Sequence, residues 1–332
     1  MERENTIQPF QAGDVFVSCT WLNDENDDHK GWGRIIQYDA DLNEKGVLWI
    51  NDTEHFIVGI KFDPKGVLWG FDMHSHKVIH IDPNGIQRPT HHFADRAFGS
   101  VHFTSNGDIY FGEYLIGEHI HKGTSSKKIP GTNKLGNGNL HHFNSDWEFI
   151  EELEVENYPE LTGFKGFTHG SLHPSEEFIS YTSETSKCIR RYNIQEKQQM
   201  PDLIRITEGE IHDQNWFIAM HYLNDGNLIV TRGCDYEIYD PHGKVLDKVH
   251  LGRYGWAQIT ASVDNRFIYS TNVWTGDVAK ADPQKGEVIK MVETSNSAMT
   301  IERQKLQEAG KYMGSRAPKR AAAGIAVFNG QS

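Results

Sequence analysis

Histidine is the side chain in this sequence best suited to chemistry near neutral pH, and the chain of 332 residues holds 18 of them. His74 and His76 lie two residues apart, as do His119 and His121, so each pair would place both imidazoles on one face of an extended segment. Converging imidazoles can ligate a divalent metal or transfer protons. We therefore predict these four residues as metal ligands. The alternative is that a histidine-rich chain uses most of these rings in packing.

A second set of candidate residues stands at the ends of apolar strand segments, at equivalent positions of a repeated pattern. Such carboxylates, imidazoles and cations would equip a channel mouth for proton transfer or for holding a small polar molecule. We assign catalytic roles to His169, His55, Glu113 and Glu184. We assign substrate binding to Asp72, Arg96, Asn215, Arg232 and Tyr254. The alternative for this set is ordinary solvated charge on a rim.

The elements that must position these residues belong to a repeat. A short apolar strand that ends in Asp or Asn, just before a turn, occurs six times. The copies are residues 35–39, 78–82, 140–144, 189–193, 236–240 and 278–282. The short polar side chain can bond the backbone of the following turn. A supersecondary unit that recurs every 40 to 50 residues or so is typical of a propeller or a solenoid.

A second repeated sequence pattern, or phrase, has the order strand, turn, strand and alternates with the first along the chain. It runs over 59–69 and 100–110 and recurs more loosely three more times, while a sixth copy is split between 324–330 and 13–17. Pairing of the two terminal strands would close the sheet edges of an open array. We therefore predict one all-β domain over residues 1–332, a six-bladed β-propeller with four antiparallel strands in each blade. Its inner strands are expected near 57–63, 97–103, 167–173, 216–222, 256–262 and 322–328.

Three connections are longer than a bare blade requires, and long loops are where function is commonly added. They span 19–33, 113–139 and 294–321, and the last contains a helical run near 301–312. All three should lie at one end of the central channel. We interpret them as a cap over a pocket, with surface decoration or an oligomer contact as the alternative.

His169 is the leading candidate for a general base or a ligand. The repeat has glycine at the comparable place in other blades, as at Gly59 and Gly99, so an imidazole there exceeds what packing requires. We expect His169 at the channel mouth, facing Glu113 and Glu184 from neighbouring blades.

Composition limits the partners and the compartment. A formal charge of −13 argues against nucleic acid, whose phosphates need clustered cations. Three cysteines without a CxxC spacing favour a reduced, cytoplasmic protein. The polar start of the chain and the lack of a long apolar stretch indicate neither export nor membrane insertion. No nucleotide cofactor is indicated, and the oligomeric state stays open.

The blade phrases at 59–69, 78–85 and 324–327 resemble those of the SMP-30/gluconolactonase/strictosidine-synthase-like propellers and, more distantly, NHL repeats. The resemblance covers nearly the whole chain and implies the propeller fold. In the lactonase branch it implies a divalent cation held by Glu, Asn and Asp at the starts of inner strands. The matching column here reads Val58, Phe98, Thr168, Phe217, Ala257 and Ala323. None is a good ligand, so we expect the usual calcium site to be absent.

These observations favour an enzyme that acts on a small polar molecule in the channel mouth. It would be a hydrolase or lactonase, or a lyase, and the sequence leaves open whether a divalent metal takes part. A metal-free catalyst like that of the strictosidine-synthase branch would use one carboxylate, Glu113 or Glu184, with a pKa raised by burial. A propeller that only binds a partner is the remaining alternative.

Overall fold

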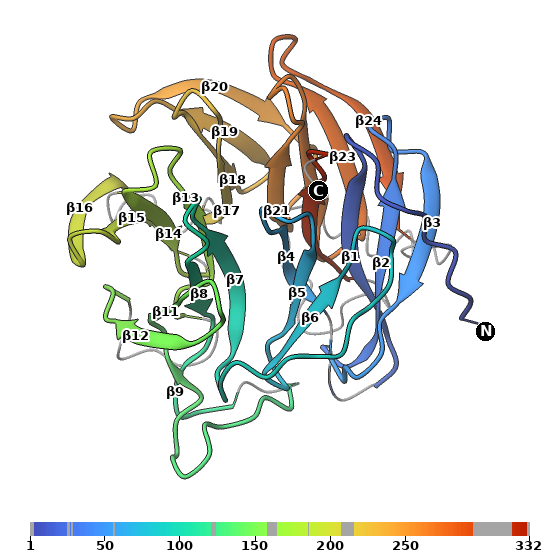
Figure 1. The fold of residues 1–332 in the computed structure, drawn as a ribbon. Coiled ribbons are helices and arrows are strands. Elements are labelled where there is room, and N and C mark those ends of the chain that lie inside the picture. Colours follow the sequence, from blue (N-terminus) through green and yellow to red (C-terminus); the bar gives the residue numbers. More distant parts are fainter. Residues whose placement is uncertain are drawn as a thin grey trace.

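Six antiparallel sheets stand around a central channel (Figure 1). The computed structural model describes residues 3–24, 27, 29–55, 57–120, 124–157, 165–184, 186–206, 216–294 and 321–330. These residues form no helix. The prediction of an all-β, six-bladed propeller is confirmed, whereas the helical run expected near 301–312 lies outside the described residues.

The strands of a blade follow one another from the channel outward. Blade 1 holds β25 (Ala321–Val327), β1 (Val15–Leu22), β2 (Gly31–Tyr38) and β3 (Glu44–Trp49). Blade 2 holds β4 (Val58–Phe62), β5 (Leu68–Asp72) and β6 (Lys77–Ile81). Blade 3 holds β7 (Phe98–Phe103), β8 (Ile109–Glu113), β11 (Leu140–Phe143) and β12 (Phe149–Leu153).

The other half of the ring has the same order. Blade 4 holds β13 (His169–Leu172), β14 (Phe178–Thr182), β15 (Cys188–Asn193) and β16 (Gln198–Arg205). Blade 5 holds β17 (Phe217–Tyr222), β18 (Leu228–Arg232), β19 (Asp235–Tyr239) and β20 (Val245–His250). Blade 6 holds β21 (Trp256–Ala261), β22 (Ile268–Asn272), β23 (Asp277–Asp282) and β24 (Glu287–Glu293).

The ring is closed by the two terminal strands, as predicted. β25 pairs with β1 in antiparallel register, with Val327 opposite Val15 and Ile325 opposite Val17. The channel strands contact one another in the order β25, β4, β7, β13, β17 and β21, and β21 contacts β25 again. Each channel strand therefore contacts the channel strands of both neighbouring blades, and the ring is closed.

The core lies between the blades, because each sheet is buried on both faces. Alternate side chains of a strand point to opposite faces. In β1, Phe16 packs toward blade 2 with Leu68, whereas Val15 and Val17 pack toward blade 6 with Val278. One apolar cluster fills each of the six junctions between neighbouring blades. This explains why the strand segments read as nearly continuous apolar runs.

The Asp or Asn that ends each copy of the first phrase organises the turn from the third to the fourth strand. Asp82 accepts the backbone N–H groups of Asn84 (3.0 Å) and Ile86 (3.1 Å) through Oδ1. The same kind of contact recurs at Asp39, Asn144, Asn193, Asp240 and Asp282. The repeat signal therefore has a local, structural origin.

Blade 2 and the insertions depart from the simplest repeat. The segment that follows β6 is joined to it only by bridges at Ile81–Gln87 and Val78–His91, because Pro89 cannot donate to the ladder. The connection expected over 19–33 is shorter, since β1 continues to Leu22 and β2 begins at Gly31. The 113–139 connection carries the small ribbon of β9 (Ile116–Gly117) and β10 (Gly136–Asn137). Most of the 294–321 connection lies outside the described residues.

Candidate functional site at the lower mouth of the channel

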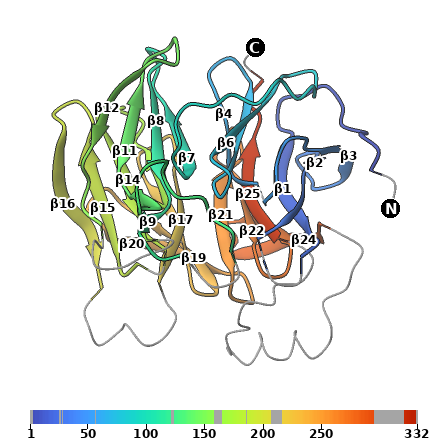
Figure 2. The same ribbon diagram turned by 90° about the horizontal axis from the view of Figure 1, so that it is seen from below.

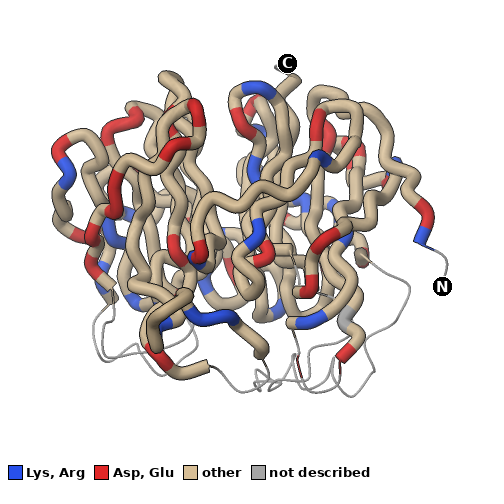
Figure 3. The backbone as a smooth tube through the Cα atoms, turned by 60° about the horizontal axis from the view of Figure 1, so that its bottom comes forward, with Lys and Arg blue, Asp and Glu red and all other residues tan. Residues whose placement is uncertain are grey.

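The second strand of most blades ends in or near a polar residue, all at one end of the channel. Asp72, Glu113, Arg232 and Asn272 are the last residues of β5, β8, β18 and β22, and Glu184 follows β14. We call this end the lower mouth. The opposite, upper end carries the turns after β4 and β7 and the described C-terminal residues (Figure 2). Acidic and basic residues are mixed around the ring (Figure 3).

Most of the predicted residues that the structure describes lie at this end, but they fall into separate groups rather than one site. Asp72 contacts His55 in blade 2, and Glu113 contacts Arg96 in blade 3. The sequence pattern gives the height of a residue along the axis, not its neighbours across the mouth.

Asp72 is buried and its oxygens bind inside the fold. Oδ2 accepts the backbone N–H of Glu54 (3.0 Å) and of His55 (3.2 Å), while Oδ1 accepts that of Ser75 (3.2 Å). The Ser75 hydroxyl also donates to Oδ2 of Asp72. Asp72 therefore links the entry of β4 to the turn after β5, and its carboxylate is not directed at a ligand.

His55 lies between two carboxylates. Its Nδ1 is 3.4 Å from Oδ1 of Asp72, and its Nε2 is 3.6 Å from Oδ2 of Asp27 and 3.0 Å from the Ser125 hydroxyl. Burial alone would lower the pKa of His55, but the hydrogen bonds and charges of Asp27 and Asp72 raise it to about 9. At neutral pH His55 is thus a buried cation, a state in which it cannot accept a proton as a general base.

The predicted histidine metal site does not assemble from the residues described. His74 and His76 lie in a turn, where His76 has a positive φ of 60°, so they do not share the face of an extended segment. The buried His74 accepts or donates a hydrogen bond at the Ser126 hydroxyl (2.6 Å) and lies beside the His55 ring. His119 is exposed, and His121 lies outside the described residues.

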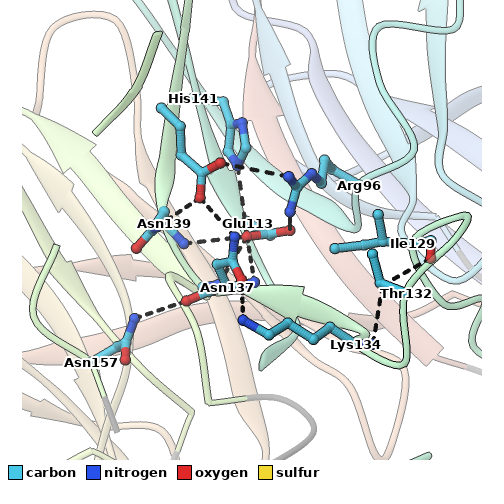
Figure 4. Close-up of polar contacts among 11 residues, drawn as sticks. Arg96, Glu113, Ile129, Thr132, Lys134, Asn137, Asn139, His141 and Asn157 are labelled. Carbon is cyan, nitrogen blue, oxygen red and sulfur yellow. Dashed lines mark hydrogen bonds and ion pairs between the residues drawn. The ribbon is translucent and has the colours of Figure 1, made fainter. Parts of the chain in front are cut away.

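Glu113 anchors the long connection of blade 3 (Figure 4). Its Oε2 accepts the backbone N–H groups of Asn137 (2.8 Å), Gly138 (2.9 Å) and Asn139 (3.4 Å). Its Oε1 lies 3.2 Å from Nη1 of Arg96. These bonds hold the returning end of the insertion against β8, and they explain a fully buried carboxylate without a catalytic role.

The Glu113 group also contains a set of possible metal ligands that the sequence reasoning missed. Ligand atoms of Glu113, His141 and Glu152 lie within 4.8 Å of one another, the only such group among the described residues. The His141 Nε2 is 3.6 Å from Glu113 and has no hydrogen-bond partner among the described residues. Arg96, however, reaches both Glu113 and Glu152, at 3.2 and 3.5 Å. A guanidinium thus already supplies the positive charge that a cation would bring.

Glu184 lies in a different environment, next to Lys165 at the entry to blade 4. Lys165 donates through Nζ to the backbone carbonyl of Glu184 at 2.8 Å. Burial raises the pKa of the Glu184 carboxyl, although the positive charges of Lys165 and His29 lower it in part. Burial also lowers the pKa of Lys165, against the charge of Glu184. Both residues have intermediate burial.

His169 lies at the start of β13 and lines the channel. Its Nδ1 is 3.2 Å from the Gln258 side-chain amide, and its ring meets the edge of the Tyr114 ring at 5.9 Å between centroids. Burial lowers the pKa of His169 to about 4, so the imidazole is neutral at neutral pH. Burial raises the pKa of Tyr114 and the charge of Glu184 adds to the rise, so Tyr114 lies near Glu184 as well as near His169. The expected direct contact between His169 and Glu113 is not seen.

The other predicted binding residues are distributed around the mouth. Arg232 pairs with Glu237 (3.3 Å) and covers the Phe217 ring at 5.3 Å. Tyr254 is partly exposed, and its backbone carbonyl accepts the Asn272 amide at 2.6 Å. Asn215 lies outside the described residues.

Sequence reasoning missed several residues of these groups. Asp27 lies in a run of acidic residues, and nothing in the sequence distinguishes it from the other acids of that run. Ser125 comes from the middle of a long insertion. Lys165, in contrast, follows from the sequence pattern, because it stands just before an inner strand, as Arg96 does.

Comparisons with known proteins agree on the fold. No protein-family model matches the chain, and no curated protein is similar to it in sequence. Among solved structures, a chain of the nidogen/laminin complex is similar with a TM-score of 0.63 and 11% identity, over 96% of this chain and 100% of that one. Virginiamycin B lyase from Staphylococcus aureus is similar with a TM-score of 0.50 and 14% identity, over 86% of this chain and 90% of that one.

At these identities the comparisons show the fold alone. The chain is a β-propeller protein of six blades, and its resemblance to the SMP-30/gluconolactonase group stays a prediction. Within the described residues there is no helix of the length and hydrophobicity that crossing a membrane requires.

Proposed function

We propose that this propeller is an enzyme that acts on a small polar molecule at the lower mouth, through proton transfer in a hydrolase-like or lyase-like reaction. The observation that carries the proposal is the partly exposed pair of Glu184 and Lys165, whose pKa values burial moves toward each other. Opposite shifts in neighbouring titratable groups are typical of acid–base sites.

The two shifts define complementary roles near neutral pH. A carboxyl whose pKa is raised can hold a proton and donate it to a leaving group. An amine whose pKa is lowered can be neutral and accept a proton from a substrate or from water. Glu184 is thus the proposed acid and Lys165 the proposed base, with their roles exchanged in the return step.

Neutral polar groups beside the pair are suited to orient a substrate. His169, Tyr114 and Gln258 each carry a hydrogen-bonding group at the same end of the channel. None of the three is charged at neutral pH, since burial lowers the pKa of His169 and raises that of Tyr114. They can therefore orient a substrate through hydrogen bonds without adding a charge of their own. A structural relative named as a lyase supports the elimination branch of the proposal.

A version with a divalent metal would use Glu113, His141 and Glu152, whose ligand atoms lie close together. Such a metal would polarise a substrate oxygen or a water molecule. It would have to displace Arg96, which already contacts both carboxylates. Elemental analysis of protein purified without added metal distinguishes the versions. Stoichiometric zinc, iron or copper supports the metal version, and its absence supports proton transfer alone.

The experiment that tests the proposal measures turnover with two panels of probes. Small lactones and esters are followed by acid release, and β-substituted carboxylates are followed by the ultraviolet absorbance of the new double bond. We expect the wild-type protein to turn over members of one panel. Glu184→Gln should then lose at least about a hundredfold in kcat, the usual scale for an acid–base group. Its melting temperature should stay within a few degrees.

Glu177→Gln is the matched control, because Glu177 is an exposed carboxylate of the same blade. It should keep the wild-type rate. A wild-type protein inactive on both panels, or a Glu184→Gln variant as active as its parent, would overturn the proposal.

A binding scaffold is the second candidate. It is favoured by the similarity to a chain of the nidogen/laminin complex, a propeller found in an assembly with another protein. Cross-linking in lysate followed by mass spectrometry tests it. A scaffold predicts one reproducible protein partner whose capture is unchanged in Glu184→Gln, together with no turnover of any probe.

A further inference from the structure

The channel contains a cavity of about 440 Å³ whose lining shares only His169 and Gln258 with the residues of the proposed reaction. It opens at the upper end near Asp63, Ser105 and Asn329. Its inner wall includes the side chains of Lys61, His169, Met220, His221, Gln258 and Thr260. The wall is therefore polar and includes a cation, while its carboxylates, Asp63 and Glu176, stand at the entrance.

Lys61 is the unusual member of this wall. It is the last residue but one of β4, and its side chain makes no ion pair or hydrogen bond with any residue that the structure describes. Burial alone lowers the pKa of its ammonium to about 8. Lysine is rarely enclosed without a partner, because a desolvated ammonium is costly unless an opposite charge or hydrogen-bond acceptors surround it.

The charge of Lys61 reaches the channel axis. It lowers the pKa of His102 on β7, the next strand around the ring, and that of His221 on β17, the strand opposite. Burial is the larger cause in both cases and brings the pKa of His221 to about 3. Both imidazoles are therefore neutral at neutral pH and can donate one N–H each. Neither ring nitrogen of the buried His102 has a hydrogen-bond partner within the described part of the chain.

The two carboxylates at the entrance are already engaged. Asp63 accepts the backbone N–H groups of Lys65 (2.9 Å) and Val67 (2.8 Å) and the indole N–H of Trp69 (3.0 Å).

Glu176 accepts the backbone N–H of Ser105 through both oxygens at 3.0 Å, and the Ser105 hydroxyl at 2.8 Å. Neither carboxylate is paired with Lys61. A chain with a formal charge of −13 thus contains an inner chamber with one uncompensated positive charge.

We infer that this cavity binds a small organic monoanion, a carboxylate, with Lys61 as its counter-ion and the imidazoles of His169 and His221, which line the cavity, as hydrogen-bond donors. A single cation matches a single negative charge, whereas a dianion would leave one charge unpaired in the chamber. The Gln258 amide and the Thr260 hydroxyl supply further donors on the same wall. The inference goes beyond the proposed reaction and does not depend on Glu184.

The test is calorimetric titration of the full chain with acetate, propionate and sulfate at pH 6.5, in a buffer free of chloride. We expect acetate and propionate to bind the wild-type protein and sulfate to bind at least tenfold more weakly. Lys61→Met should lose at least tenfold in carboxylate affinity, the scale of one charge-assisted contact. Lys65→Met is the control, because Lys65 is an exposed lysine in the adjoining turn, and it should bind as the wild type does.

Thermal stability gives a second, independent readout. Lys61→Met removes an uncompensated charge, so its melting temperature without anions should equal or exceed that of the wild type. Added acetate should raise the melting temperature of the wild type but not of Lys61→Met.

A third variant, His221→Phe, removes one N–H donor and should weaken acetate binding by a smaller factor than Lys61→Met does. Tighter binding of sulfate than of acetate would overturn the choice of a monoanion. Equal acetate affinity in wild type and Lys61→Met, a lower melting temperature of Lys61→Met, or no binding of any anion would overturn the site itself.

Discussion

The Nδ1 atom of His55 lies 3.4 Å from the Oδ1 atom of Asp72, and both side chains are almost fully buried. A second carboxylate, that of Asp27, lies 3.6 Å from the other ring nitrogen. The three groups join the loop before β2, the entry of β4 and the end of β5 into one ionic cluster. Its charge state therefore affects how firmly the lower mouth is held together.

The His55 cluster should make stability depend on pH. The pKa of His55 is raised to about 9, so its stabilising contribution is complete below about pH 6.5 and is lost as the pH rises through 9. The difference in free energy of unfolding between wild type and His55→Gln should accordingly shrink across this window. Urea unfolding at a series of pH values measures it.

Comparison of the two proteins at each pH cancels the titration of other groups, such as Lys61. His242→Gln, which alters an exposed histidine, should show no such dependence. A constant difference between wild type and His55→Gln from pH 6.5 to 9.5 would mean that His55 is neutral in the folded protein.

The closing strand should be essential. Removal of residues 324–332 takes away most of β25 and leaves β1 with an unpaired edge. It also removes apolar side chains from the junctions of blade 1 with blades 2 and 6. We expect no cooperative thermal transition and a tendency to aggregate. A truncated chain that remains monomeric and melts as the parent does would contradict closure as the source of stability.

Phe328, just after β25, allows a milder test. Its ring lies 5.7 Å from that of Phe10 and 5.1 Å from that of Phe62, between centroids. Phe328→Ala should cost about 3 to 5 kcal/mol of unfolding free energy, the usual range for a buried phenylalanine. Ile86→Ala, at a side chain that is 61% exposed, should change it by less than about 0.5 kcal/mol.

Glu113→Ala should release the insertion of blade 3. The change leaves the backbone N–H groups of residues 137–139 without their acceptor, at a cost of about 1 to 3 kcal/mol. Limited trypsin digestion should cut faster after Lys127 and Lys128 than in the wild type. Glu154→Ala, an exposed carboxylate of the same blade, should be cut at the wild-type rate.

His169→Asn should separate activity from folding if the lower mouth is the site. Loss of the neutral imidazole should lower turnover at least about a hundredfold, while the melting temperature stays within a few degrees. Gln258→Ala, which removes the residue bonded to Nδ1 of His169, should have a smaller effect on turnover. Full activity of His169→Asn would show that the ring serves only to pack the channel.

The sequence was sufficient for the ring but not for the contacts across its mouth. The six Asp and Asn turn residues repeat because each makes the same local bond, so the repeat could be read along the chain. The position of Asp72 at the end of β5 followed from the same repeat. Its pairing with His55 did not, because it depends on how the chain enters β4.

The contacts of residues in the insertions were harder still to predict from the sequence. Ser125 meets His55 only because the blade 3 connection folds back over blade 2, and no periodic signal encodes that path. Lys61 is a different case. Lys61 occupies the position in its strand–turn–strand repeat that His102 and His221 occupy in theirs. The register of β4 with β5 matches that of β7 with β8 at this position. A comparison of these columns could have shown that one inner strand carries a cation.

The pairing of β25 with β1 also constrains how the protein is made. β1 leaves the ribosome early, whereas its partner strand follows about 300 residues later, which takes roughly 15 to 60 s at ordinary rates of translation. For that time the first blade presents an open strand edge to the cell. Until β25 is made, this edge can pair with strands of other chains, and the long separation of the two strands in sequence prolongs that risk.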